Sequence, residues 1–201
     1  MDVKFNAPRQ PESSEETRSV RHNGRPHARP DTFKGAMAGL IAGLVGTYFM
    51  SEYQGLWSKW VNGAEPNTPG GRHDARDWEE KNEGDNANQQ AAQAVARHTV
   101  GRELTDDELE IAAPLMHYAF GGAISAAYGI FAEHTRWARG GAGAGYGTVV
   151  WAGADEIAMP LIGWSDPQRF PLESHLQSFT AHLVFGVTTE MTRRAVRRLL
   201  E

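Results

Sequence analysis

Four ionisable side chains lie inside otherwise uncharged, apolar stretches of this sequence. Asp155 and Glu156 are neighbours in a glycine-rich run, and His117 and His182 interrupt two other apolar runs. Burying a carboxylate pair is costly, so such a pair is seldom accidental in an apolar run. If the runs are helices that pack together, the four side chains can form a hydrogen-bonded cluster that exchanges protons near neutral pH. The structural alternative is that these polar side chains only hold the helices together.

The four side chains fall at similar depth if each run crosses a membrane. A helix rises about 1.5 Å per residue, which places the acidic pair about 14–15 Å, His182 about 12 Å and His117 about 8–9 Å from the outer ends of their runs. On a regular helix Asp155 and Glu156 point about 100° apart, so we expect one of them to face the interior. Pro160 should kink this helix, because it withholds a backbone donor from the Glu156 carbonyl.

Other site chemistries are less favoured. His175 and His182 are seven residues apart and share one helical face, a spacing that also suits two axial ligands of a metal or tetrapyrrole. We favour an interfacial His175 and a hydrogen-bonded His182, and we predict no metal and no cofactor. The chain has no cysteine, which excludes disulfides, thiolate metal sites and a cysteine nucleophile. No phosphate-binding, zinc-protease or serine-hydrolase motif is present, so we predict no catalytic residue and no enzyme.

Four apolar runs supply the helices that would hold these side chains. They lie at about residues 33–55, 111–132, 140–164 and 174–195, within a predicted membrane domain of residues 33–198. The fold class that we predict is therefore all-α, an integral membrane bundle of four transmembrane helices. The uncharged cores of the first, third and fourth runs are shorter than the roughly 20 residues that a full crossing needs, and a soluble helical bundle is the alternative.

Small residues recur at four-residue spacing in three of the runs, and each set forms one stripe on a helix. Such stripes let helices approach closely in lipid, whereas in water each helical glycine costs about 1 kcal/mol relative to alanine. The predicted helix-packing residues are Gly35, Gly39, Gly43, Gly121, Ser125, Gly129, Gly143 and Gly147.

The polar segments set the predicted topology. Residues 1–32 hold many charges and few large apolar side chains, which is typical of a disordered tail. Residues 56–110 form a long polar outer loop with one or two short helices, of which one spans 86–100 and ends at Gly101; a capping box of Thr105 and Glu108 begins the next helix. Lysine and arginine are densest in the tail, in the turn 133–139 and after Glu190, so both termini are predicted to be cytoplasmic.

Glu190 lies three and four residues before Arg193 and Arg194, a spacing that predicts a local ion pair. The net charge of −5 gives no nucleic-acid footprint. The predicted partner is the lipid bilayer, and no nucleic acid is expected.

The later two-thirds of the chain resembles the YagU-like inner-membrane proteins of bacteria. The resemblance rests on KGAMAGLIAGLVGTYFM, on the P-x-x-HYAFG segment from Pro114 to Gly121, on WAGADEIAMPLIGWS and on HLQSFTAHLVFGVTTEMTRRAVRR. It implies a multi-pass protein of the bacterial inner membrane. It implies no established substrate, cofactor or catalytic residue.

Two functions from different classes follow. The leading interpretation is a non-enzymatic membrane protein that handles protons or a small solute through a polar layer in the outer half of the bundle. The alternative is a structural or accessory subunit, whose glycine-striped helices pack into a homo-oligomer or a larger membrane complex. A membrane enzyme is the weakest interpretation, because no nucleophile–base pair is visible.

Overall fold

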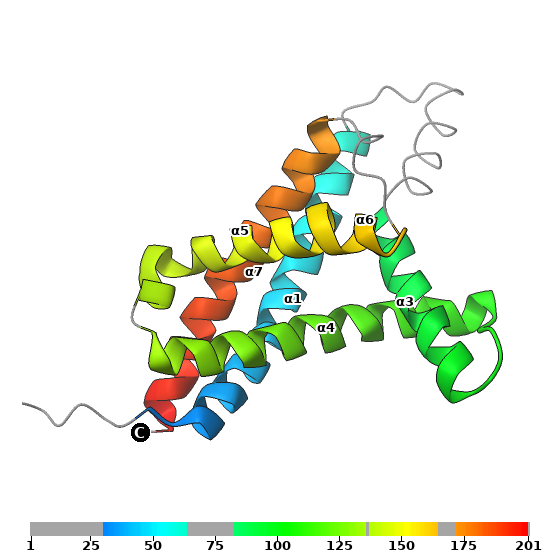
Figure 1. The fold of residues 1–201 in the computed structure, drawn as a ribbon. Coiled ribbons are helices and arrows are strands. Elements are labelled where there is room, and N and C mark those ends of the chain that lie inside the picture. The colour runs from blue at the N-terminus through cyan, green and yellow to red at the C-terminus, as the bar shows by residue number, and fades with distance from the viewer. Residues whose placement is uncertain (1–29, 64–82, 136, 165–171, 201) are drawn as a thin grey trace, which may run out of the picture.

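The computed structural model describes residues 30–63, 83–135, 137–164 and 172–200, and every regular element in these ranges is helical (Figure 1). The predicted all-α class is therefore confirmed for this part of the chain. The tail up to residue 29 and the loop residues 64–82 lie outside it. The elements are α1 (Thr32–Gly63), α3 (Glu83–Thr99), α4 (Asp106–His134), a 3-10 segment (Trp137–Gly143), α5 (Ala144–Gly153), a π-helical turn (Ala154–Ala158), α6 (Met159–Leu161) and α7 (Leu172–Leu199).

Local sequence signals explain where several helices begin and end. Asp31 caps α1, because its Oδ1 accepts the backbone N–H of Lys34 at 3.0 Å. The predicted capping box at the start of α4 is confirmed: Thr105 and Glu108 each accept the other's backbone N–H. The predicted end of α3 is confirmed as well, since Gly101 adopts a left-handed φ of 75° directly after it.

The helices form two crossed antiparallel pairs (Figure 1). α1 and α7 lie side by side, and α4 and the α5–α6 segment run across them. α3 packs on α4 at the far end of the molecule. The beginning of α1 and the end of α7 meet, where Lys34 Nζ donates to the Leu200 carbonyl at 2.8 Å.

The small-residue stripes lie at the closest helix contacts. Gly35, Gly39 and Gly43 of α1 face Gly129, Ser125 and Gly121 of α4 in antiparallel order. A Cβ placed on Gly39 would come within 2.9 Å of the Ser125 carbonyl carbon, well inside van der Waals contact. Gly143 and Gly147 make the same kind of approach to α7, beside Gly186 and the backbone of His182. All eight of these small residues therefore pack within one chain.

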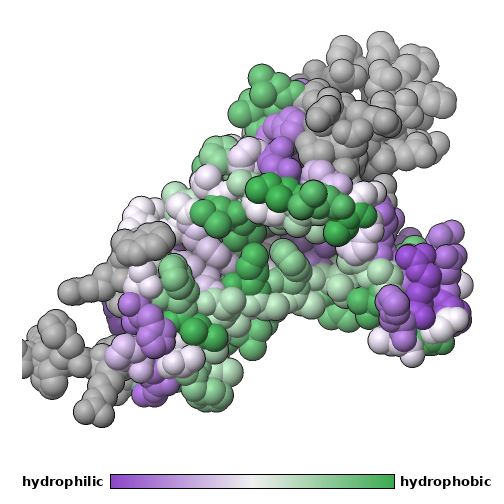
Figure 2. Space-filling view, in the orientation of Figure 1, coloured by the Kyte–Doolittle hydropathy of each residue, from purple (hydrophilic) through white to green (hydrophobic). Residues whose placement is uncertain are grey.

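The buried positions are mostly small or polar, and many large apolar side chains face outward. Fully enclosed side chains include Thr47, Ser125, Thr189 and Glu190, while the apolar core proper centres on Met50, Val150, Ala181 and Phe185. Exposed apolar side chains cover α1, α4 and the α5–α6 segment, as Figure 2 shows for the face in view; strongly polar surface gathers on α3.

Among the described residues, one helix is long and apolar enough to cross a membrane by length and composition, namely α1 over Thr32–Val61. The prediction of four transmembrane spans is therefore not confirmed. The predicted span 140–164 is divided among the 3-10 segment, α5, the π-helical turn and α6, so it contains no single long helix. The glycines and the proline of this run also interrupt its helix.

Candidate functional site

A π-helical turn carries the adjacent carboxylates. It spans Ala154–Ala158 and stands directly before Pro160. Proline has no N–H and its ring collides with the carbonyl four residues earlier, here that of Glu156, so a regular helix cannot continue through this point. The wider turn accommodates the conflict, and such π bulges occur frequently at functional sites. Both carboxylates of the turn contact α7, although adjacent residues of a regular helix point about 100° apart.

Asp155 meets two side chains of α7. Its Oδ2 accepts a hydrogen bond from the Ser178 hydroxyl and lies 3.7 Å from Nδ1 of His182. His182 Nδ1 also lies 2.9 Å from the Ser178 carbonyl oxygen, and because that oxygen can only accept, Nδ1 carries the proton. The imidazole is thus oriented with one N–H toward the carboxylate side of the site.

Glu156 pairs with a different histidine. Its Oε1 lies 2.9 Å from Nδ1 of His175, and both side chains are about seven-tenths buried. His175, Ser178 and His182 occupy one face of α7 at spacings of three and four residues. The two carboxylates and two imidazoles therefore form neighbouring acid–histidine pairs, hereafter the paired site, at one contact between the π-helical turn and α7.

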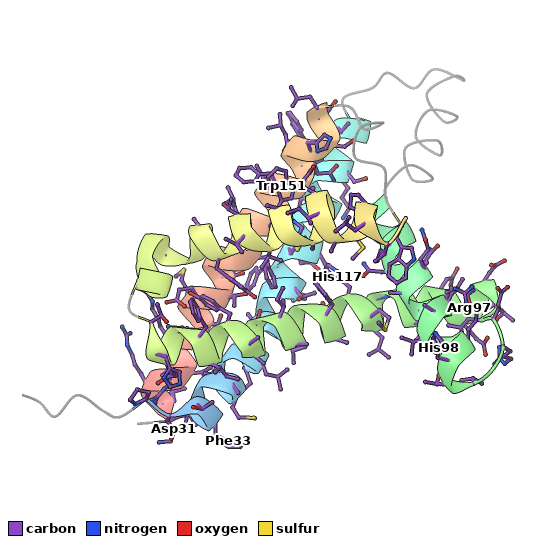
Figure 3. The ribbon with its side chains drawn as sticks, viewed as in Figure 1. Asp31, Phe33, Arg97, His98, His117 and Trp151 are labelled. Carbon is purple, nitrogen blue, oxygen red and sulfur yellow. The ribbon has the colours of Figure 1, made fainter. Side chains whose placement is uncertain are left out.

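His117 belongs to a different contact. Its Nδ1 lies 3.4 Å from the Asn88 amide of α3, and Figure 3 shows the side chain on α4 pointing toward the α5–α6 segment. Whereas one cluster of four residues was predicted, the structure gathers Asp155, Glu156 and His182 with His175, and it places His117 beside α3. Ser178 was missed, although its position three residues after His175 on the same face was a visible signal.

The two halves of the paired site differ. Glu156 lies within hydrogen-bond distance of His175, whereas Asp155 accepts from Ser178 and lies 3.7 Å from His182, beyond hydrogen-bond distance. Ser178 donates its hydroxyl proton to Asp155, and a serine nucleophile would instead give it to a histidine base. In the described part of the chain, no three His, Asp or Glu side chains converge as metal ligands.

A second polar cluster lies at the end where α1 begins and α7 ends, hereafter the α1/α7 end. Buried Glu190 accepts from Arg193 Nε at 2.7 Å and from Arg194 Nε at 2.6 Å, which confirms the predicted local ion pair. The Tyr128 hydroxyl of α4 also donates to Glu190, at 3.0 Å. Sequence spacing could not foresee this long-range partner.

Glu133, which follows the predicted second span, links α4 to the end of α7. Its carboxylate accepts from Arg197 Nε at 2.8 Å and from Arg197 Nη2 at 3.1 Å. Burial alone would raise the pKa of Glu133, but the hydrogen bonds and charge of Arg197 outweigh it and hold the pKa below its usual range. Glu133 is therefore a fixed anion at neutral pH, in an anchoring role.

Residues 65–191 match a protein family whose description is "Protein of unknown function (DUF1440)". The matched range includes the paired site, Glu133 and Glu190, and it ends just before Arg193. No curated protein and no solved structure gives a significant match.

Proposed function

We propose that this chain, which belongs to the family of proteins of unknown function (DUF1440), is a multi-pass inner-membrane protein that binds and releases protons at the paired site. The observation that carries the proposal is the joint placement of Asp155 and Glu156, each with its own histidine of α7. Ionisable groups inside a membrane domain are expensive to keep and usually mark ion or proton pathways.

The surface of the molecule supports the membrane part of the proposal. Phe33, Leu56 and Leu161 have 74%, 64% and 80% of their surface exposed, and all would be better solvated by lipid than by water. The rings of Trp57 and Trp60 meet edge to face near the end of α1, where an aromatic belt is expected. The 32 residues of α1 span about 48 Å, enough to cross the bilayer with both interfaces.

The four predicted spans, the cytoplasmic termini and the YagU-like assignment are part of this proposal. In support, α1, α4, the α5–α6 segment and α7 form one bundle, held by contacts between small residues. Close packing of small residues is how helices associate in lipid, where hydrophobic burial gives little driving force. Irregular backbone inside a membrane needs protein beside it, and the contacts of Asp155 and Glu156 with α7 place protein against one side of the π-helical turn.

The site's polarity favours protons over a larger solute. Its carboxylates already contact side chains of α7 directly, at 2.9 Å between Glu156 and His175 and through the hydrogen bond from Ser178 to Asp155. A proton can enter such a pair without separating the helices, whereas a solute of several atoms would have to displace α7 from the π-helical turn.

Proton binding can be measured without knowing the physiological process. We would compare the full chain in detergent or lipid with the double variant Asp155→Asn/Glu156→Gln by infrared difference spectroscopy across a pH titration. The expected result is loss of the carboxyl and imidazole bands that titrate together in the wild type. Asp106→Asn, at the exposed start of α4, is the matched control and should leave those bands in place.

A double variant that titrates like the wild type would refute the proposal. Retention of the helical circular dichroism spectrum shows that a lost band does not come from unfolding. If the chain stays monodisperse in plain buffer without detergent, the membrane assignment fails whatever the titration shows.

The accessory-subunit alternative has narrower support. The predicted small residues pack inside one chain, so they do not remain available for a second copy. The outer face of α5 is different, because Gly145 and Gly153 have nothing within 4 Å and Val149 between them is 70% exposed. Gly145→Leu should reduce oligomer size in detergent if this face assembles, and unchanged size would count against it.

A further inference from the structure

At the α1/α7 end the carboxylates of the ion pairs are buried, while some of the cations are exposed. The side chain of Glu190 is 1% exposed and that of Glu133 is 10% exposed, whereas that of Arg194 is 42% exposed. Arg198 is exposed as well, and Lys34 is half-buried. A ligand that approaches this end from outside therefore meets positive charge first.

The positive charge at this end is not fully neutralised by its partners. Five cationic side chains stand against three carboxylates among the described residues here, an excess of two positive charges. The cations are Lys34, Arg193, Arg194, Arg197 and Arg198, and the carboxylates are Asp31, Glu133 and Glu190. Since Arg193 and Arg197 are buried with the carboxylates, the excess lies on the exposed Arg194 and Arg198 and on the half-buried Lys34.

One exposed stripe of α7 combines this charge with apolar side chains. Met191, Arg194, Ala195, Arg198 and Leu199 are all exposed, at the helical spacings of three and four residues that define a single face. Met191 is 64% and Leu199 85% exposed. The stripe contains no carboxylate, and it lies on the last turns of α7, beside the start of α1 in Figure 1.

We infer that this stripe of α7, together with Lys34 of α1, binds the headgroup of an anionic phospholipid. Arginine donates bidentate hydrogen bonds that match the geometry of a phosphate, and Met191 and Leu199 can lie along the acyl chains. A zwitterionic lipid offers the same phosphate but adds a cation, which the excess positive charge disfavours. The inference rests on the proposed membrane insertion and is independent of proton binding.

The test is a lipid competition on the intact chain. Native mass spectrometry would count the phospholipids that remain bound after release from micelles containing equal amounts of phosphatidylglycerol and phosphatidylcholine. The wild type should retain phosphatidylglycerol preferentially. Arg194→Gln/Arg198→Gln should lower the affinity for phosphatidylglycerol by roughly 25-fold, since each cation at an anionic surface contributes about fivefold, and should leave phosphatidylcholine binding unchanged.

Lys59→Gln, an exposed cation near the other end of α1, is the matched control and should keep the wild-type preference. Millimolar inorganic phosphate should not displace the lipid; displacement would assign the site to the free anion and overturn the proposal. Equal retention of the two lipids by the wild type, or an equal loss in Lys59→Gln, would also overturn it. The lipid measurements do not involve Asp155 or Glu156. The lipid proposal can therefore be refuted while the proton-binding proposal holds, and the proton-binding proposal can be refuted while the lipid proposal holds.

Discussion

Replacing Gly39 with alanine tests whether the close approach of α1 and α4 stabilises the fold. The added methyl would come within 2.9 Å of the Ser125 carbonyl carbon and 3.0 Å of the Ala126 Cα. Both neighbours are backbone atoms of a helix, so neither can move aside as a flexible side chain would. The helices must separate by several tenths of an ångström along the whole stripe.

The size of the effect follows from two opposing terms. Overpacking against rigid neighbours costs typically 1–3 kcal/mol, and we take about 2–3 kcal/mol because the obstacle is backbone. Alanine in place of glycine inside a helix returns about 1 kcal/mol. Gly39→Ala should therefore destabilise the protein by about 1–2 kcal/mol. Gly55→Ala on the same helix has nothing within 4 Å and should stabilise by up to about 1 kcal/mol.

The assay is reversible unfolding of both variants in mixed micelles, followed by circular dichroism. The two substitutions are chemically identical and lie on one helix, so their opposite signs depend only on what faces each glycine. If Gly39→Ala is as stable as Gly55→Ala or more so, the α1–α4 contact is not as close as described, and the reasoning from small-residue packing is wrong.

Two further predictions concern the charged groups. The hydrogen bonds from Arg102 and from the Thr105 backbone lower the pKa of Glu108 to about 2, so ionised Glu108 stabilises the folded state. This stabilisation is complete above pH 4.5 and is lost as the pH falls toward 2. Arg102→Gln should therefore raise the pKa of Glu108 measured by NMR titration. Glu190→Gln removes the carboxylate that hydrogen-bonds the buried Arg193 and leaves it only Glu133, at 4.0 Å, so the variant should cost about 3–5 kcal/mol in the unfolding assay. Arg194→Gln, on an exposed cation, should cost less than about 1 kcal/mol. Similar losses in the two variants would contradict the burial of the Glu190–Arg193 pair.

The candidate site was predictable in its acidic half. An Asp-Glu pair followed by a proline in an apolar run indicated a kinked helix beside the acidic pair. This could be predicted because all of these residues lie within about six positions of one another. The histidine partners were harder to predict. The position of His117 along its helix suggested that it lies level with the acidic pair. That position does not tell toward which side of the helix the side chain points, and His117 lies beside Asn88 of α3. Regular helix geometry predicted that only one of Asp155 and Glu156 would face inward, whereas both carboxylates reach α7.

Local chemistry along the chain was enough to place most helices, the capping box of Thr105 and the Glu190–Arg193 pair, because each depends on residues within one or two turns. The same was true of the small-residue spacing, which defines a face on each helix without naming its partner. Only the packed molecule decided that Gly39 lies against Ser125, that Tyr128 also binds Glu190, and that Arg193 is buried with Glu190 while Arg194 stays exposed. These contacts depend on the angles at which the helices cross and on how each helix is rotated about its axis. Both are set by packing between residues that are far apart in the sequence.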